Sequence, residues 1–359
     1  MTQAPFPYFG GKSRIAFKVW ERLGDVDNYV EPFFGSGAML LNAPRIHRIE
    51  TVNDADGYIA NFWRAVQSDP DAVAHYADWP ANENDLHARH AWLTERRDDL
   101  RARLEGDPDY CDAKIAGWWC WGMCVWIGGE FCSGKGPWHV ETNENGEKEL
   151  VNSKNARQGV RRRIINLGNA GKGVSRQMIH LGNAGQGVSR QMINLGNAGK
   201  GVSRNVSVYD WMQALSDRLA RVRVCCGDWS RICGPSVTTH NGAIQNGLTA
   251  VFLDPPYGSA DRAKNIYTTE CLKVAGDVRK WCLENGDNSQ MRIALCGYEG
   301  EHGELESNGW TVLEWKSREG YGGAGNGKAN ENSEKERVWF SPHCVAEMPL
   351  FTNGVLQCS

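Results

Sequence analysis

The sequence predicts an α/β protein built on an open sheet with helices on both faces. Residues 28–41 combine a short strand, a Gly-x-Gly turn and an apolar helix. A second apolar run at 248–253 stops at two prolines, as a buried strand does when it ends abruptly. From 208 to 341 helical and strand patterns alternate. With 359 residues, the chain has room for one large α/β domain and an inserted or appended region.

The first strand region begins with an aromatic loop, Pro5 to Lys12, which contains two glycines and ends in a lysine. A helix is predicted from Ser13 to Leu23, with Ser13 as its N-cap. The strand that starts at Asn28 then runs into Gly35-Ser36-Gly37. Glycines in such a turn let the backbone approach a nucleotide-like ligand. The third glycine of the dinucleotide fingerprint is missing, so the turn alone does not identify the ligand.

A second strand is predicted at 50–54, and it ends in the acid Asp54. In a βαβ unit this position suits a carboxylate that holds ribose hydroxyls. A helix follows at 58–66, and from 69 to 112 the chain predicts polar helices with solvated, mixed-charge faces. Residues 116–127 form a tryptophan-rich helix, which is typical of a buried core element. A glycine-rich loop follows it.

The middle of the chain contains a tandem repeat with a period of 14 residues, in the copies 166–179, 180–193 and 194–204. A degenerate copy precedes them at 152–165. From 152 to 208 there are ten Lys or Arg residues and no Asp or Glu, in a chain whose net charge is −3. This one-sided charge favours contact with nucleic-acid phosphates. A disordered insertion and a small array made for packing remain the alternatives.

Two further strand ends carry an acid next to an aromatic residue. The strand at 222–226 leads to Asp228 and Trp229, and the strand at 248–253 leads to Asp254-Pro255-Pro256-Tyr257. The prolines remove two N–H groups and leave carbonyls free to accept hydrogen bonds. A carboxylate, carbonyl acceptors and a flat ring together suit a planar substrate with an exocyclic amine. A simple proline turn is the alternative for this tetrapeptide alone.

The composition, with 41% hydrophobic and 23% charged residues, is that of an ordinary globular protein. We expect no secretory signal and no membrane span, because no apolar stretch approaches about 18 residues. We expect the protein to be in the cytoplasm, associated with DNA. Its 12 cysteines are therefore expected to be reduced thiols. We expect no metal, because Cys120, Cys124 and Cys132 lack a fourth ligand at suitable spacing.

Taken together, these motifs resemble the Dam-like family of DNA adenine-N6 methyltransferases in the α arrangement. The matching segments, in order, are Tyr8-Phe-Gly-Gly-Lys12, Phe33-Phe-Gly-Ser-Gly37, a target-recognition region and Asp254–Tyr257. The resemblance implies a Rossmann-like S-adenosylmethionine-dependent sheet with an inserted target-recognition domain. It divides the chain into catalytic residues 1–68 and 206–345, an inserted region 69–205 with the repeat array at 152–205, and a tail 346–359.

The resemblance also implies roles for single residues. Asp254, Pro255, Pro256 and Tyr257 would be catalytic, and Asp254 would also line the S-adenosylmethionine site. The other residues implied at the cofactor are Tyr8, Lys12, Phe33, Gly35, Gly37, Asp54, Asp228 and Trp229. For duplex DNA, the loop 129–131 resembles the family's DNA-facing loop. From their charge we add the candidate DNA contacts Lys135, Arg161, Arg162, Arg163, Lys172, Arg176, Arg190, Lys200 and Arg204.

Two other functions remain open from the sequence. Methylation of cytosine N4 in DNA would use the same geometry on another exocyclic amine. A catalytically silent DNA-binding regulator belongs to a different class, and an RNA guanine-N2 methyltransferase is more remote. Asp before Pro-Pro-Tyr and the order of the motifs favour adenine. The sequence leaves open the recognition site, the biological role, a restriction partner and formation of a homodimer.

Overall fold

The structure is a computed structural model that describes residues 3–8, 11–126, 131–132, 138–142, 148–152, 207–241, 244–257, 269–315 and 336–346. Its centre is a seven-stranded sheet in the order β10-β11-β9-β8-β1-β2-β5. The strands are β1 (Asn28–Glu31), β2 (Ile49–Asp54), β5 (Val222–Cys226), β8 (Thr249–Leu253), β9 (Met291–Tyr298), β10 (Thr311–Glu314) and β11 (Glu336–Phe340). The expected α/β fold with a Rossmann-like sheet is confirmed.

Five neighbouring strands of this sheet run in the same direction. β1 pairs in parallel with β2 and β8, β2 with β5, and β8 with β9, whereas β11 is antiparallel to β9 and β10. β8 is buried along its whole length, which explains its continuous apolar sequence, because parallel strands are covered on both faces. The carboxyl ends of the five parallel strands therefore meet at one edge of the sheet.

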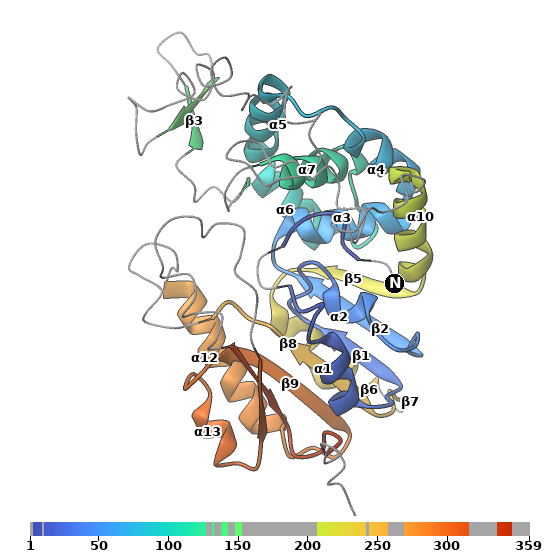
Figure 1. The fold of residues 1–359 in the computed structure, drawn as a ribbon, viewed down its shortest axis with the longest axis vertical. Coiled ribbons are helices and arrows are strands. Elements are labelled where there is room, and N and C mark those ends of the chain that lie inside the picture. Colours follow the sequence, from blue (N-terminus) through green and yellow to red (C-terminus); the bar gives the residue numbers. More distant parts are fainter. Residues whose placement is uncertain are drawn as a thin grey trace, which may run out of the picture.

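The helices lie in groups around the sheet (Figure 1). Helices α3 to α7 and α10 gather beyond the β5 edge, and α12 and α13 lie beside β9. Their bounds, with those of α1, α2 and the short helices, are α1 Ala16–Leu23, α2 Ala38–Leu41, α3 Gly57–Ser68, α4 Pro70–Ala77, α5 Glu83–Glu95, α6 Arg97–Gly106, α7 Ala113–Val125, α10 Val208–Leu219, η1 Trp229–Ile232, α11 Pro235–Thr238, α12 Thr269–Asn285 and α13 Gly303–Glu306. Two small hairpins complete the fold, β3 (Trp138–Thr142) with β4 (Lys148–Asn152) and β6 (His240–Asn241) with β7 (Ile244–Gln245).

An aromatic core fixes the N-terminal loop against the helices. The ring of Phe6 meets Phe62 at 5.1 Å and Trp119 at 4.8 Å between ring centroids, both edge-on. Phe62 comes from α3 and Trp119 from the tryptophan-rich helix α7, which is buried as its composition predicts. The short loop that leads to Lys12 is thus held by side chains from two helices.

One local prediction is wrong. Ser13 is not the N-cap of the first helix, since α1 begins at Ala16 with Ile15 as its cap and without a side-chain capping bond. The carbonyl of Lys12 accepts from the backbone N–H groups of both Ile15 and Ala16. A turn anchored on Lys12 therefore satisfies the first donors, and no hydroxyl is needed there.

Candidate active site

The carboxyl edge of the sheet contains a topological switch point between β1 and β8. From β1 the chain moves outward to β2 and β5, and later it returns to the other side of β1 through β8 and β9. Open α/β sheets bind ligands in the crevice where the strand order reverses in this way. The segments that follow β1 and β8 are the Gly35–Gly37 turn and Asp254–Tyr257. The fold therefore brings together the two motifs that the sequence singled out.

Asp254 is held by two side chains at this switch point. The Lys12 Nζ lies 2.8 Å from Asp254 Oδ2, and the Tyr257 hydroxyl donates to Oδ1 at 2.8 Å. The Lys12 ammonium also lies 5.3 Å from the centre of the Tyr257 ring. Of the catalytic candidates between them, Pro255 is buried and Pro256 is exposed. The structure thus joins Lys12 to residues more than two hundred positions later in the chain.

The Lys12 ammonium is deeply buried, with 3% of its side chain exposed. Burial by itself would lower the pKa of Lys12, but the charges around it, that of Asp254 foremost, together with the hydrogen bond to Asp254 outweigh burial and raise the pKa above its ordinary value. Lys12 therefore stays positively charged. The Asp254 carboxyl oxygens beside this fixed cation are acceptors to which a substrate amine could donate hydrogen bonds.

The glycine turn is shaped by positive backbone angles and by Asp54. Gly35 has a φ of +49° and Gly37 a φ of +63°, in the left-handed region that glycine enters without strain. A Cβ at Gly35 would lie 2.6 Å from the half-exposed ring of Tyr8, so the ring covers the turn closely. Asp54 Oδ2 accepts from the Gly35 N–H at 2.8 Å, and the Trp63 indole donates to the Gly35 carbonyl at 2.9 Å.

Asp54 differs electrostatically from an ordinary surface acid. Burial, together with the nearby charge of Asp56, raises the pKa of Asp54 to about 7. Hydrogen bonds from the N–H groups of Asp56 and Gly35 oppose this rise but do not cancel it. Asp54 therefore changes its charge near neutral pH, at the carboxyl end of β2 and beside the glycine turn.

Asp228 and Trp229 follow the next strand, β5, but their side chains diverge. The exposed Asp228 caps η1, and its Oδ1 accepts from the Ser230 N–H at 2.9 Å. Trp229 is buried and packs against Phe33 in a nearly parallel arrangement, with 6.1 Å between ring centroids. The Phe33 ring is only partly buried. Phe33 is thus placed between the turn after β1 and the tryptophan after β5.

Glu31 is a site residue that the sequence reasoning missed. It ends β1, just before the glycine turn, and is 2% exposed. Burial raises the pKa of Glu31 well above its ordinary value, although the Tyr29 hydroxyl donates to its Oε2 at 2.9 Å. Burial therefore favours the neutral form of Glu31, and the side chain is placed to support β1. An acid directly before a Gly-x-Gly turn was the available signal.

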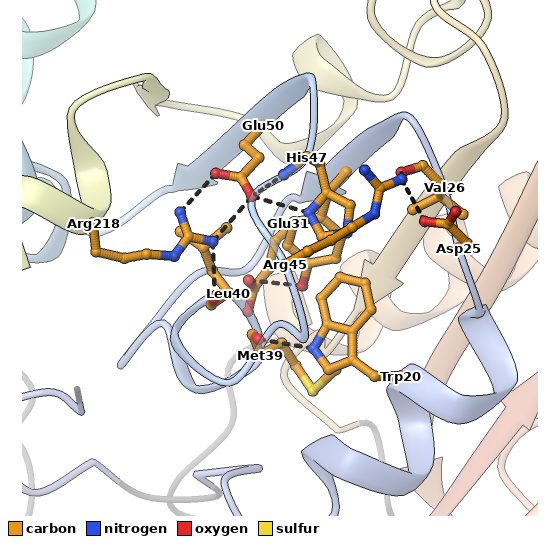
Figure 2. Close-up of polar contacts among 11 residues, drawn as sticks. Trp20, Asp25, Val26, Glu31, Met39, Leu40, Arg45, His47, Glu50 and Arg218 are labelled. Atoms are coloured by element: carbon orange, nitrogen blue, oxygen red, sulfur yellow. Dashed lines mark hydrogen bonds and ion pairs between the residues drawn. The ribbon is translucent and has the colours of Figure 1, made fainter. Parts of the chain in front are cut away.

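A polar network lies behind Glu31, as Figure 2 shows. Arg218 from α10 contacts both oxygens of Glu50, at 2.7 and 3.0 Å, and donates to the Leu40 carbonyl at 3.0 Å. His47 binds Glu50 Oε1 at 2.9 Å through Nδ1 and stacks on Trp20, with 5.0 Å between centroids. Although burial opposes it, these partners lower the pKa of Glu50. The network ties α10 to the helix that follows the glycine turn.

Two more residues near Asp254 come from the far side of the sheet. The Tyr298 ring, at the end of β9, meets the Tyr257 ring edge-on at 4.6 Å. Glu336, the first residue of β11, is 6% exposed and pairs in register with Tyr298. No sequence motif marks either residue, because Tyr298 comes to the site through the parallel pairing of β9 with β8 and Glu336 through the antiparallel pairing of β11 with β9.

Residues 8–107 match the family model described as D12 class N6 adenine-specific DNA methyltransferase. The match covers only the N-terminal part of the chain, and it supports an adenine-specific DNA methyltransferase. No curated protein matches the sequence. The family match contains Tyr8, Lys12, both turn glycines and Asp54, and it ends before the repeat and before Asp254. DNA is therefore the substrate of this methyltransferase, and the expected adenine specificity is confirmed.

The candidate DNA contacts lie outside the described residues, namely Lys135, Arg161, Arg162, Arg163, Lys172, Arg176, Arg190, Lys200 and Arg204. Of the loop 129–131, only Phe131 is described. Its ring is buried and lies 5.2 Å from the rings of both Trp126 and His90. Phe131 therefore anchors the chain after α7. Among the described residues, no helix is both long and apolar enough to cross a bilayer.

Proposed function

We propose that this enzyme transfers a methyl group from S-adenosylmethionine to N6 of an adenine that has been flipped out of duplex DNA. The observation that carries the proposal is the Lys12–Asp254–Tyr257 cluster at the switch point, next to the glycine turn. It combines a charged acceptor, carbonyl acceptors and an aromatic ring where this fold binds ligands.

The residues around the turn fit the cofactor. Gly35 and Gly37 allow a close backbone approach, and Asp54 can accept from ribose hydroxyls once it is ionised. Tyr8 and Phe33 offer apolar ring surface on either side of the turn, and we place the cofactor's adenine near Asp228 and Trp229. The cofactor would supply a methyl group activated by a positively charged sulfur.

The chain's own contribution to the reaction is positioning and electrostatics. Asp254 and the Pro255 carbonyl would accept the two N6 hydrogens, which directs the nitrogen lone pair toward the methyl group. Lys12 holds one oxygen of Asp254 in an ion pair, and Tyr257 would stack on the flipped ring. A direct in-line displacement needs no covalent enzyme intermediate, so holding the reacting atoms in line is the main task. Flipping is required because the amine is inaccessible within the duplex.

We also propose that the inserted region, 69–205, reads the DNA, with 1–68 and 206–345 as the catalytic part. The one-sided charge of the repeat supports this division, because phosphates are recognised mainly by Lys and Arg. The tail, 346–359, has no assigned part in it.

Incubation with labelled S-adenosylmethionine and unmethylated duplex DNA tests the function. We expect labelled N6-methyladenine in the DNA, no transfer by Asp254→Ala, and unchanged DNA binding by that variant. Sequencing of the modified DNA identifies both the base and its context. Labelled N4-methylcytosine would replace the adenine proposal by its nearest alternative, and absence of label from every DNA would overturn the enzymatic function.

A further inference from the structure

Asn53 is a buried polar side chain of β2 that the proposed reaction does not use. It lies one residue before Asp54 and is 1% exposed. Its Nδ2 donates to the Pro32 carbonyl at 3.1 Å and to the Gly227 carbonyl at 3.0 Å, and both bonds are buried. A single amide group thus joins two segments that are far apart in the sequence.

The two carbonyls that Asn53 holds lie at the ends of the strands on either side of β2. Pro32 follows the last residue of β1, and Gly227 follows the last residue of β5. Backbone bonds make the same connection, since the Phe34 N–H donates to the Asn53 carbonyl at 2.9 Å and the Gly227 N–H to the Asp54 carbonyl at 3.2 Å. The carboxyl end of β2 therefore fixes the spacing between the ends of its two neighbours.

The segment after each of these carbonyls belongs to the proposed cofactor site. Phe33 and the glycine turn follow Pro32, whereas Asp228 and Trp229 follow Gly227. The Phe33 and Trp229 rings lie nearly parallel, with 6.1 Å between their centroids. A ligand that reaches from the turn to Trp229 needs both segments at one spacing, and supporting hydrogen bonds are what hold such a site in shape.

The donor bonds are the polar contribution that Asn53 makes to the protein. Within the described part of the chain, no group donates to its buried Oδ1. A buried acceptor without a partner costs free energy, so the amide oxygen does not stabilise the fold. The two bonds from Nδ2 are therefore the interactions to which a role of this side chain can be assigned.

We propose that Asn53 is a positioning residue for the methyl donor. Its two hydrogen bonds set the distance between the glycine turn and the Asp228–Trp229 segment, and this spacing determines the affinity for S-adenosylmethionine. Because S-adenosylmethionine is taken as the donor, the inference rests on the proposed function. Asn53 acts through the segments that it holds, and no contact with the reacting atoms is assigned to it.

Calorimetric titration of the full-length protein with S-adenosylmethionine, S-adenosylhomocysteine and adenosine tests the inference. We expect Asn53→Ala to weaken the first two ligands, which span both segments, about 5- to 30-fold, as loss of two net hydrogen bonds predicts. Adenosine reaches only the Trp229 end, so its binding should weaken less than about 2-fold. At saturating donor, the single-turnover methylation rate should stay within about 2-fold of wild type, which places the loss in donor binding.

Asn28 provides the matched control at the opposite edge of the sheet. It begins β1, is fully buried, and donates through Nδ2 to the Val237 carbonyl at 2.7 Å and to the Thr249 hydroxyl at 3.0 Å. Asn28→Ala removes the same side chain with the same number of bonds. It should lower the melting temperature and leave all three affinities unchanged.

Equal weakening of adenosine and of the two longer ligands by Asn53→Ala would overturn the inference, because spacing acts only on a ligand that spans both segments. An equal loss in Asn28→Ala would also overturn it, since reduced stability would then explain the effect. If Asn53→Ala does not fold, Asn53→Ser, which keeps a small donor, should likewise weaken the longer ligands more than adenosine. Unchanged affinities in the Asn53 variants contradict the role of Asn53 alone, whereas a wild-type protein that binds none of the three ligands overturns the proposed donor itself.

Discussion

The Tyr257 hydroxyl donates to Asp254 Oδ1 at 2.8 Å, while Lys12 holds Oδ2 of the same carboxylate. Both oxygens of the proposed amine acceptor thus have a partner before any DNA is bound. The Tyr257 ring also lies edge-on to Tyr298. If this ring turns to stack on a flipped base, the turn would release one Asp254 oxygen. The two roles of Tyr257 would then be coupled through a single hydrogen bond.

The Tyr257 hydroxyl and ring can be separated by substitution. We expect Tyr257→Phe to keep the single-turnover methylation rate within a few-fold of wild type or to raise it, because the ring remains and Asp254 loses a competitor. Tyr257→Ala should be slower by about 5- to 150-fold, since base stacking on an aromatic ring contributes about 1–3 kcal/mol. Equal losses in the two variants would contradict the stacking role.

The Lys12–Asp254 ion pair should also stabilise the fold. Removing one partner leaves a buried charge, so Lys12→Met and Asp254→Asn should each lower the free energy of unfolding by about 3–5 kcal/mol. The double variant should lose less than the sum, with a coupling of about 1 kcal/mol or more in a denaturant-melt cycle. If the stability loss of the double variant equals the sum of the two single losses, the two groups do not interact in solution.

Cofactor affinity should depend on pH through Asp54. Its pKa of about 7 means that a proton must leave before Asp54 can accept from ribose hydroxyls as a carboxylate. We expect S-adenosylmethionine to bind about tenfold more weakly at pH 6 than at pH 8. The Asp54→Asn variant should bind weakly, without this pH dependence. An equally steep profile in Asp54→Asn would assign the proton to another group.

The raised pKa of Asp54 also predicts how the stability of the ligand-free protein depends on pH. The pKa of Asp54 is raised above its unfolded value of about 3.9, so the folded state binds the extra proton. Its contribution to stability is complete below that unfolded pKa and is lost as the pH rises through about 7. Wild type should therefore lose more stability than Asp54→Asn between pH 5 and 8, as measured by thermal melting of both proteins across that range. The opposite difference would contradict the raised pKa of the buried Asp54 carboxyl.

Gly35 and Gly234 form a matched pair for testing the turn. Gly35→Ala places a side chain at a φ of +49° and against the Tyr8 ring, whereas a Cβ at Gly234 would meet nothing within 4 Å. The backbone strain alone costs about 1–2 kcal/mol. We expect Gly35→Ala to reduce cofactor affinity at least tenfold in calorimetry and Gly234→Ala to leave it unchanged.

Neutralising Arg176, Arg190 and Arg204 together tests the repeat. If each contacts a phosphate, the triple Gln variant should bind duplex DNA more weakly, and its log–log salt dependence should flatten by about 0.9 for each lost contact. Substitution of Arg103, an exposed arginine of α6 paired with Asp99, is the control. Unchanged affinity and slope in the triple variant would favour packing or disorder over DNA contact.

Much of the sheet could be predicted because its signals are local. The apolar run of β8 and the boundaries of α10 and β5 follow from patterns within a few residues, and the structure reproduces 208–219 and 222–226. The fold also brings the Asp254 motif and the glycine turn together at the switch point, as α/β topology requires. The spacing of hydrophobic residues is sufficient to predict these helices and strands, and the acids at the strand ends are sufficient to predict where the site lies.

The remaining parts of the site depend on long-range pairing. Glu336 and Tyr298 meet because β11 lies antiparallel to β9, and no local pattern specifies that register. Glu31 was missed because its raised pKa comes from burial in the folded protein, which the residues around it in the sequence do not reveal. The start of α1 differs from the prediction because the Lys12 carbonyl, and not the Ser13 hydroxyl, accepts the hydrogen bonds of the first N–H groups. Only the pairing of Glu336 with Tyr298 joins residues distant in sequence, whereas the partners of Glu31 and α1 are near in sequence and no motif marks them.

The pairing of β2 with β5 has a consequence for how the enzyme can change in length. Asp54 and Cys226 are register partners, so the chain between them leaves the sheet and returns to the neighbouring strand. The entropic cost of closing such a long excursion grows only with the logarithm of its length, and one more 14-residue copy adds about 0.1 kcal/mol. Copies of the repeat can therefore be gained or lost by recombination while the methyl-transfer site keeps its geometry. Repeat copy number is a variable that selection can adjust separately from catalysis.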